Sequence, residues 1–394
     1  MISVNNLISV DLQIKEHERS IEGFDTVVYI TDAELTKEGK TEKYLLVNNV
    51  NELMEFVDNT KTAVIASARS YFANGGKRLL FIKPDKFGVG DFIKDINAAK
   101  RVRSNFIFIC IQDSLLSSGE LGYRNEFLDI VAYCDNTKAP DKVRLLITTN
   151  SKTFIDDNSL ADSYVAVKYC TKTVGSDLID AALLIGAYFS NIDLDTENSI
   201  KDYSYTKENL VGIDQDTAAE DLSQSDFDAM IKNDGNTGFY NVIDSVGSHV
   251  VNFGGDYAAN GGIAIHTDFG AIAIERDIVY SVLERMIGKQ YLTEQGMSNV
   301  KAAIDSKLQR YKTNGYLHIG ARYSGEDLNI TYNGKNYAVI KNGDVLTQGF
   351  LVFTVPVANI SAEDRAKRRF TPIYIVLETQ AGARVIEIGG EVRS

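Results

Sequence analysis

The residues of this chain that could bind a nucleotide form only incomplete motifs. The Gly-Gly-Lys run at residues 75–77 looks like the end of a phosphate-binding loop, in which backbone N–H groups hold phosphate oxygens. Tyr71 stands where such a loop needs its upstream glycine, and Arg78 replaces the Ser or Thr that would bind Mg²⁺. A second pair, Gly88 and Gly90, lacks the third glycine of a dinucleotide fingerprint. The sequence therefore predicts no nucleotide cofactor.

Metal-ion and acid–base chemistry have no better support. Asp193, Asp195 and Glu197 begin like a calcium loop, but Asn198 stands in place of the required glycine and Ser204 in place of the bidentate glutamate. With 54 acidic residues, carboxylate pairs arise by chance, so none can be assigned to general acid or base work. The histidines are scattered and have no cysteine at ligand spacing; they are His17, His249, His266 and His318. The sequence predicts no catalytic residue, no metal site and no cofactor, which argues against an enzyme.

The composition is that of an acidic globular protein. Of 394 residues, 44% are hydrophobic and 24% are charged, and the net charge is −13. This acidity argues against nucleic acid or an anionic membrane as the main partner, because both carry negative charge. The three cysteines are odd in number and lie in apolar runs, which favours buried thiols in a reducing compartment over disulfides. They are Cys110, Cys134 and Cys170.

No segment of the sequence is typical of a membrane span or a secretory signal. The longest apolar stretch, residues 181–189, is too short to cross a bilayer. Residues 1–6 lead directly into a segment of alternating polarity, unlike a signal peptide. We therefore expect synthesis in the cytosol.

A short cationic helix is predicted near the C-terminus. Ser361 can cap it, acidic residues follow in its first turn, and Pro372 stops it. Its last turn is basic and contains Arg365, Lys367, Arg368 and Arg369. In a continuous helix, Arg365, Arg368 and Arg369 would share one face. Two interpretations stay open, a solvated helix end whose charges match the helix dipole and a docking patch for an acidic partner.

Two β-prone segments at the ends of the chain need pairing partners. Residues 8–14 alternate cleanly, with Ile8, Val10, Leu12 and Ile14 on one face. Residues 373–377 are continuously apolar, as in a strand covered on both faces, and a second segment follows at 383–388. Its apolar residues are Ala383, Val385, Ile386 and Ile388. An unpaired terminal strand promotes aggregation unless another strand pairs with it.

Between these ends, strands and helices alternate. Strands are expected at residues 26–30, 44–47, 78–83, 106–111, 143–148 and 164–168, with helices between most of them. This order predicts an open α/β sheet with crossover helices. Residues 191–201 are polar and favour a domain boundary, and the following part is mixed α/β, with a hairpin at Asn333-Gly334. The predicted divisions are an arm (1–22), an α/β domain (23–196), a second domain (197–378) and an arm (379–394).

Several short segments, taken in order, resemble the sheath proteins of contractile phage tails. The most telling is SYFANGGKRLLFIK at residues 70–83, a helix that ends in aromatic residues and Asn-Gly-Gly, followed by a strand that ends in a basic residue. NLVGI at 209–213, the glycine-rich run 254–268 before a long helix, KTNGYL at 312–317 and the basic SAEDRAKRR segment follow in the family's order. Each motif is weak alone, and their joint order carries the resemblance over nearly the whole chain.

The resemblance implies a structural role. Sheath subunits form helically stacked rings around a tail tube, and contraction drives the tube through the host envelope. It implies an open α/β outer domain and a mixed α/β C-terminal domain whose sheet is completed by terminal arms of neighbouring subunits, by β-augmentation. The expected partners are further copies of the chain, the tube protein, and baseplate and tail-terminator proteins, within a virion tail assembled in the host cytoplasm. The resemblance also assigns the basic segment at 365–369 to tube contact.

Two alternatives stay open. One is the sheath of a related contractile machine, of the bacteriocin or secretion type. The other is a cytosolic enzyme that uses the α/β domain, with a pocket at the strand ends.

Overall fold

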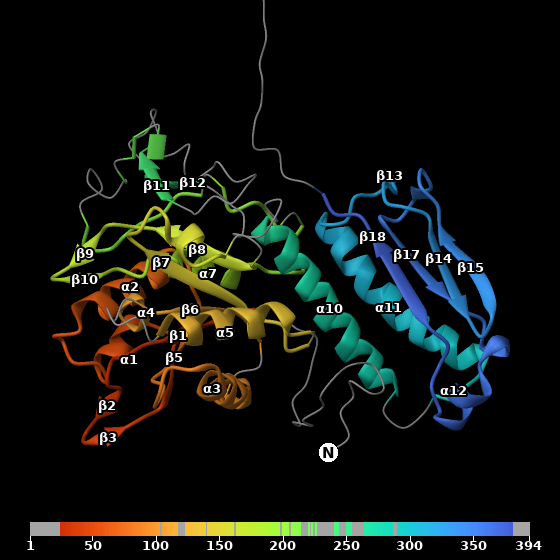
Figure 1. The fold of residues 1–394 in the computed structure, drawn as a ribbon, viewed down its shortest axis with the longest axis horizontal. Coiled ribbons are helices and arrows are strands. Elements are labelled where there is room, and N and C mark those ends of the chain that lie inside the picture. The colour runs from red at the N-terminus through yellow and green to blue at the C-terminus, as the bar shows by residue number, and fades with distance from the viewer. Residues whose placement is uncertain are drawn as a thin grey trace, which may run out of the picture. The chain divides into compact units, whose positions relative to one another are not determined.

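The computed structural model (Figure 1) describes most of the chain. The described residues are 24–102, 105–116, 123–138, 140–160, 163–197, 199–204, 206–213, 220, 222–223, 225–226, 240–243, 250–253, 264–286 and 290–380. They form two compact units. The first comprises the chain up to Leu194 and residues 205–276, and the second comprises Asp195–Ser204 and the chain from Asp277 onward. The predicted division at residues 22, 196 and 378 stays a prediction.

The first unit is built on a six-stranded sheet of order β4-β5-β1-β6-β7-β8. Its strands are β1 (Thr26–Ile30), β4 (Tyr44–Val47), β5 (Arg78–Ile82), β6 (Phe106–Ile111), β7 (Arg144–Thr149) and β8 (Val165–Tyr169). β4 runs antiparallel to β5, and the other pairs are parallel. Every residue of β1, β6, β7 and β8 is buried, as expected of strands that are covered on both faces. The predicted α/β architecture is confirmed, with strand ends that differ by one residue at most.

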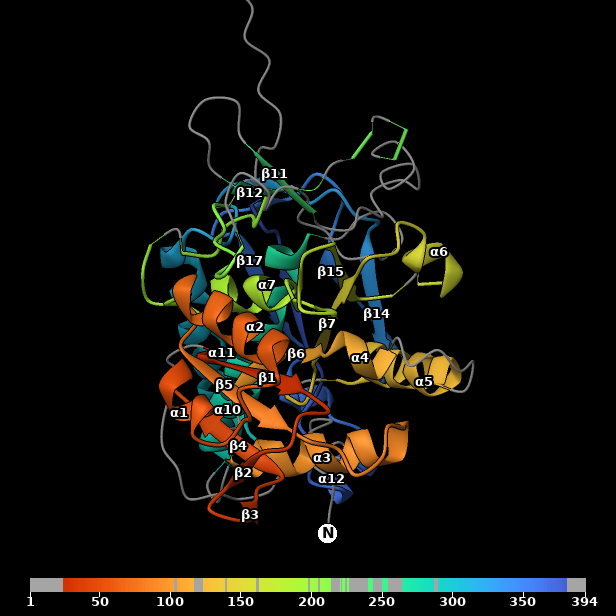
Figure 2. The same cartoon turned by 90° about the vertical axis from the view of Figure 1, so that its left-hand side faces the viewer.

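Helices cover both faces of this sheet (Figure 2). They are α1 (Val50–Met54), α2 (Thr62–Ala73), α3 (Val89–Val102), α4 (Asp113–Leu116), α5 (Tyr123–Asn136), α6 (Phe154–Asp157) and α7 (Leu183–Ser190). On one face, Phe92 of α3 and Phe127 of α5 lie in one apolar cluster with Val28 and Ile30. α2 and α7 pack together, and α7 also packs on β1. A methyl group at Gly186 of α7 would lie 2.8 Å from Val27, so this glycine permits the close approach of α7 to β1.

Small hairpins and one long helix complete the first unit. The hairpins are β2 (Thr36–Lys37) with β3 (Lys40–Thr41), β9 (Thr173–Val174) with β10 (Asp177–Leu178), and β11 (Tyr240–Ile243) with β12 (Val250–Phe253). The helix α10 (Ile265–Met286) belongs to the first unit up to Arg276. Its Phe269 stacks on Phe108 of β6, with ring centroids 6.2 Å apart.

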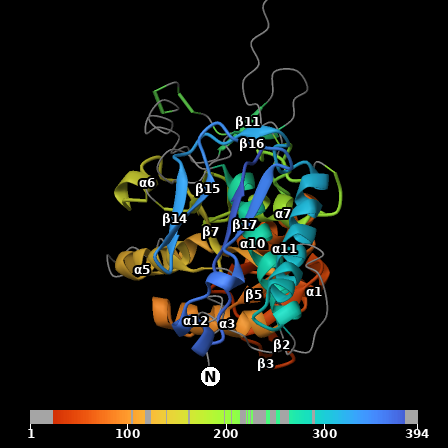
Figure 3. The same ribbon diagram turned by 90° about the vertical axis from the view of Figure 1, so that its right-hand side faces the viewer.

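The second unit combines helices with short antiparallel strand pairs (Figure 3). Besides the rest of α10, it contains α11 (Glu294–Asn314), the 3₁₀ turn η2 (Val357–Asn359) and α12 (Ala362–Ala366). Its strands are β13 (Ala321–Arg322), β14 (Leu328–Tyr332), β15 (Lys335–Ile340), β16 (Val345–Leu346), β17 (Phe350–Thr354) and β18 (Ile373–Leu377). The predicted hairpin is confirmed: Asn333 and Gly334, with φ of 49° and 73°, form the two-residue turn between β14 and β15.

Candidate functional site

The structure describes one of the two predicted sets of site residues. The eight predicted arm residues, from Ile8 to Ile14 and from Ala383 to Ile388, lie outside the described residues. The four cations from Arg365 to Arg369 are described, and so is the strand β18 that precedes the C-terminal arm. The candidate site is therefore built from α12 and β18, both in the second unit.

The helix α12 begins as the sequence predicts. The side chain of Ser361 accepts a hydrogen bond from the backbone N–H of Asp364 at 3.0 Å, which caps the first turn. Tyr332, at the end of β14, donates its hydroxyl hydrogen to the Asp364 carboxylate at 2.7 Å and accepts from the Ser361 N–H at 3.3 Å. These contacts tie the start of the helix to the β14–β15 hairpin.

The helix ends earlier than predicted. Its last residue is Ala366, and Arg368 has a φ of 55°, in the left-handed region. The N–H of Arg369 donates to the Asp364 carbonyl at 2.8 Å, and the N–H of Arg368 donates to the Arg365 carbonyl at 3.1 Å. This pair of bonds is a Schellman cap, which reverses the chain and stops the helix. The prediction that Arg365, Arg368 and Arg369 share one helical face is therefore wrong.

All four cations are exposed, but their electrostatic surroundings differ. Lys367 forms an ion pair with Glu363 one turn earlier in the helix. Within the described ranges, Arg365 and Arg368 have no side-chain partner. Two guanidinium groups are thus left to contact another molecule.

Asp364 is held in its ionised form. Its pKa is lowered, mainly by the hydrogen bond from Tyr332, then by that from Ser361, with Arg369 and Lys367 adding smaller effects. The pKa of Tyr332 is raised, mainly by burial and then by its hydrogen bond to Asp364. The carboxylate therefore keeps its hydrogen bonds from the hydroxyls of Tyr332 and Ser361 to a lower pH than an ordinary Asp would.

The strand β18 presents half-exposed apolar side chains. All five of its residues are half-buried, so the prediction of a strand covered on both faces is wrong for the single chain. Tyr374 and Val376 pack on an apolar cluster around Ile330 and Val355. Ile373, Ile375 and Leu377 alternate onto the opposite face.

In the described part of the chain, one edge of β18 has no strand beside it. Among the described residues, β17 is the only strand that pairs with it. At the ends of this ribbon, the Val355 N–H donates to the Pro372 carbonyl at 3.2 Å and the Glu378 N–H donates to the Gly349 carbonyl at 3.1 Å. Because backbone groups alternate along an antiparallel strand, the N–H and C=O groups of Ile373, Ile375 and Leu377 point away from β17. They can accept a further strand.

The two residues that follow Glu378 after β18 are hydrogen-bonded to residues 316–317 of the same unit. Thr379 forms an isolated antiparallel bridge with Leu317, and the Gln380 N–H donates to the Tyr316 carbonyl at 2.9 Å. The arm predicted from residue 379 thus has its first two residues fixed to its own unit. No local sequence pattern marks this bridge.

In the first unit, the structure brings two of the resemblance motifs together. The Asn74 side chain donates to the Asn209 carbonyl at 2.7 Å and accepts from the Asn209 N–H at 2.9 Å. The Val211 N–H donates to the Ser70 hydroxyl at 3.0 Å. Residues 209–213 are therefore fixed to the end of α2, which gives these motif residues a structural role.

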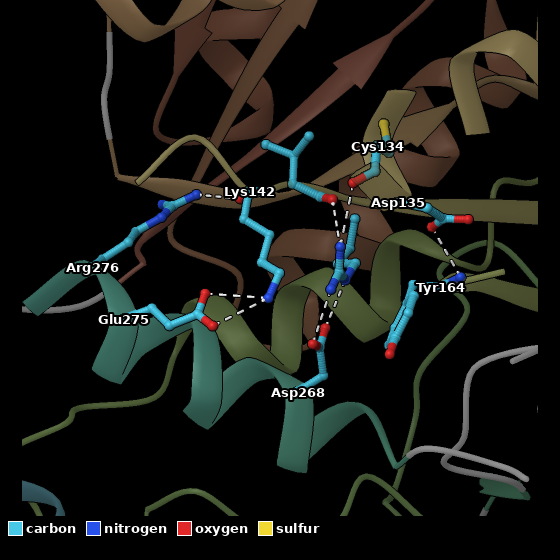
Figure 4. Close-up of polar contacts among 9 residues, drawn as sticks. Cys134, Asp135, Lys142, Tyr164, Asp268, Glu275 and Arg276 are labelled. Carbon is cyan, nitrogen blue, oxygen red and sulfur yellow. Dashed lines mark hydrogen bonds and ion pairs between the residues drawn. The ribbon is translucent and has the colours of Figure 1, made fainter. Parts of the chain in front are cut away.

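Charged residues in the first unit also serve packing (Figure 4). The buried Arg144 binds both carboxylate oxygens of Asp268 at 2.7 and 3.0 Å, and its guanidinium lies 4.3 Å from the ring centre of Tyr164. Lys142 pairs with Glu275, and Arg276 donates to two backbone carbonyls, those of Phe106 and Lys142. These contacts fix the first part of α10 to the sheet.

No cluster of three His, Cys, Asp or Glu side chains suited to a metal ion occurs among the described residues. Within the same residues, no helix is both long and apolar enough to span a membrane.

Comparisons with known proteins place the fold. No protein-family model and no curated protein matches the sequence. Solved structures do match in fold, and two of them are assemblies of the anti-feeding prophage. A chain of its baseplate, determined by cryo-EM, has 14% identity and a TM-score of 0.68, with 98% of this chain and 99% of that chain covered. A chain of its helical sheath in the contracted state has 15% identity and a TM-score of 0.66, with 96% and 98% covered.

This protein therefore has the fold of subunits of contractile, tail-type assemblies. The resemblance to sheath proteins is confirmed at the level of the fold. Because both solved chains belong to the anti-feeding prophage, the likeness does not separate a phage sheath from that of a related injection system.

Proposed function

We propose that this chain is a structural subunit of a contractile sheath, either of a phage tail or of a related injection system. Copies polymerise helically around a tube, and shortening of the polymer drives the tube through a target envelope. The observation that carries the proposal is the nearly full-length likeness to a chain of a contracted helical sheath. This role needs no catalytic residue or cofactor, and in a phage it places the chain in the virion tail.

The open edge of β18 suggests how copies are linked. A strand from a neighbouring copy can pair with the outward backbone groups of Ile373, Ile375 and Leu377 and cover their half-exposed side chains. The candidate donors are the segments 8–14 and 383–388 of a neighbouring copy. Such head-to-tail contacts do not close between two copies and therefore build rings or helices.

The exposed guanidinium groups support a contact with the tube. Arg365 and Arg368 are exposed and have no intramolecular side-chain partner among the described residues, which suits them to an acidic surface of another protein. Exposed ion pairs are individually weak, under about 1 kcal/mol, and are screened by salt. Weak contacts are compatible with a tube that slides when the sheath shortens. Baseplate and terminator proteins would bind the two ends of the polymer.

Electron microscopy of the purified chain and of a truncated variant tests the proposal. The full chain should form hollow tubes or rings in negative stain. A variant that ends at Gln380 keeps the Leu317–Thr379 bridge and lacks residues 381–394, so it should stay folded but not polymerise. Circular dichroism checks the fold of the variant.

Two outcomes would contradict this picture. A full chain that stays monomeric across protein concentration and salt would exclude a self-assembling sheath subunit. Polymers of the truncated variant would instead leave the sheath assignment standing and remove the C-terminal strand donor.

A further inference from the structure

A fully buried carboxyl group lies at the centre of the first unit. Asp180, just before α7, is 2% exposed. Tyr29 of β1 donates its hydroxyl hydrogen to one carboxylate oxygen, and the N–H of Asp113 in α4 donates to the other at 3.1 Å. The Asp180 N–H donates to the hydroxyl of Ser67 in α2 at 2.9 Å. One residue thus connects the start of α7 to β1, α2 and α4.

Among the residues that the structure describes, no positive charge compensates this carboxyl group. Within the described part of the chain, no Lys, Arg or His lies within ion-pair distance of Asp180. The charged groups near it, Asp113 and Asp32, have the same sign as its ionised form, and Lys61 lies 3.8 Å from the Asp32 carboxylate. From the sheet, β6 presents the buried thiol of Cys110 and β7 the uncharged Thr148.

Asp180 contacts the carboxyl ends of two neighbouring strands, β1 and β6. β1 and β6 lie side by side, and from them the sheet extends in opposite directions. In open α/β sheets, the carboxyl ends of such strands commonly form the ligand site. Here the Asp113 N–H, two residues after β6, is bound by Asp180, and the Thr31 hydroxyl after β1 donates to Gln112. These two donors are thus used inside the protein.

We propose that Asp180 is a proton-dependent latch: the junction of the start of α7 with β1 and α4 is firm while this buried carboxyl group is neutral, and it loosens when the group ionises without a compensating positive charge.

Burial determines how the stability of this junction depends on pH. Desolvation raises the pKa of Asp180 to about 7; the hydrogen bonds from Tyr29 and Asp113 oppose the shift, and the charges of Asp113 and Asp32 add to it. The pKa values of Tyr29 and Cys110 are raised as well, so both stay neutral. In the unfolded chain an Asp ionises near pH ~3.9. The stability contributed by the proton is therefore complete below that pH, falls as pH rises, and is lost above pH 7 or so.

Urea unfolding of the full chain at a series of pH values tests the latch, at a concentration where sedimentation shows dispersed protein. The comparison is between the wild type and Asp180→Asn, which keeps the size and an acceptor but cannot ionise. Relative to the variant, the wild-type unfolding constant should rise about tenfold per pH unit between pH ~5 and ~7 and then level off. A matched control is Asp177→Asn, the same change at an exposed position three residues earlier, which should follow the wild type.

A ratio of unfolding constants that does not change with pH would overturn the proposal. If Asp180→Asn does not fold, Tyr29→Phe replaces it. This variant removes the hydroxyl donor that favours the ionised carboxyl group, so the levelling should move to higher pH. If the unfolding constant of Tyr29→Phe levels off at the same pH as that of the wild type, the latch is overturned as well. Both comparisons are independent of whether the chain forms a sheath.

Discussion

At the scale of residues, the four C-terminal cations are not equivalent. Lys367 is paired with Glu363 within its own helix turn, whereas Arg365 and Arg368 have no such partner among the described residues. The charge on Arg369 contributes to the lowered pKa of Asp364. A contact with an acidic partner should therefore depend most on Arg365 and Arg368.

Charge reversal at these two positions separates tube contact from self-assembly. The double variant Arg365→Glu with Arg368→Glu should assemble poorly on tubes, while tube-free polymers form at the wild-type level. The reason is that each subunit loses two attractive contacts and gains two repulsive ones, repeated along the tube. Co-sedimentation with purified tubes over a salt series measures the effect, and the wild-type interaction should weaken as salt rises.

The matched control exchanges the existing pair, Glu363→Lys with Lys367→Glu, which preserves the net charge. Tube binding by this control should stay close to wild type. If the double reversal reduces both kinds of assembly equally, the basic segment has a structural role within the subunit and the tube contact lies elsewhere.

At the scale of elements, the basic segment is a cap rather than a helical stripe. Arg368 occupies the left-handed position of a Schellman motif, which glycine usually fills because it has no Cβ. For other residues this conformation costs roughly 1–2 kcal/mol. The chain thus tolerates backbone strain at an exposed cation.

Replacing Arg368 by glycine should stabilise the fold and weaken tube binding together. Relief of the left-handed strain should raise the free energy of unfolding by roughly 0.5–1 kcal/mol, measured by urea denaturation. Arg368→Ala is the control, because it removes the same charge but retains a Cβ and should give no such gain. Equal stability of the two variants would show that the backbone at this position is not strained.

The open strand edge can be blocked one donor at a time. Ile375→Pro removes an N–H group that points away from β17, so it should leave the β17–β18 pairing in place and prevent addition of a further strand. Polymer yield in negative stain and by sedimentation should fall strongly. Ile375→Thr keeps the N–H group and the β-branched shape, and should still polymerise. Normal polymers of the folded proline variant would argue against strand addition at this edge.

At the scale of the whole molecule, assembly is the simplest explanation for a half-covered ribbon. A two-stranded ribbon is marginally stable by itself, and here it is supported by packing on one apolar cluster and by α11. A further strand would complete both its hydrogen bonds and its burial. The truncation after Gln380 tests this at the level of the polymer, whereas the Asp180 comparison concerns the first unit alone.

Much of the fold could be predicted from the sequence, because it depends on local patterns. Apolar runs located strands such as β1 and β6, since these strands are buried on both faces. Asn333-Gly334 located a hairpin because few other residues adopt its turn. Ser361 and the acidic first turn correctly located the start of α12. The resemblance to sheath proteins depended likewise on short local motifs in a fixed order.

Only the tertiary structure decided the rest, because those features depend on contacts between residues far apart in sequence. Tyr29 and Asp180 are 151 positions apart, and Asn74 and Asn209 are 135 apart. The cap around Arg368 and the open edge of β18 depend on where the chain turns and which neighbours it meets. An apolar pentapeptide has the same local pattern whether its cover comes from its own chain or from another copy. The sequence therefore determined that residues 373–377 form a strand, and the structure determined that, among the described residues, only one of its edges is paired.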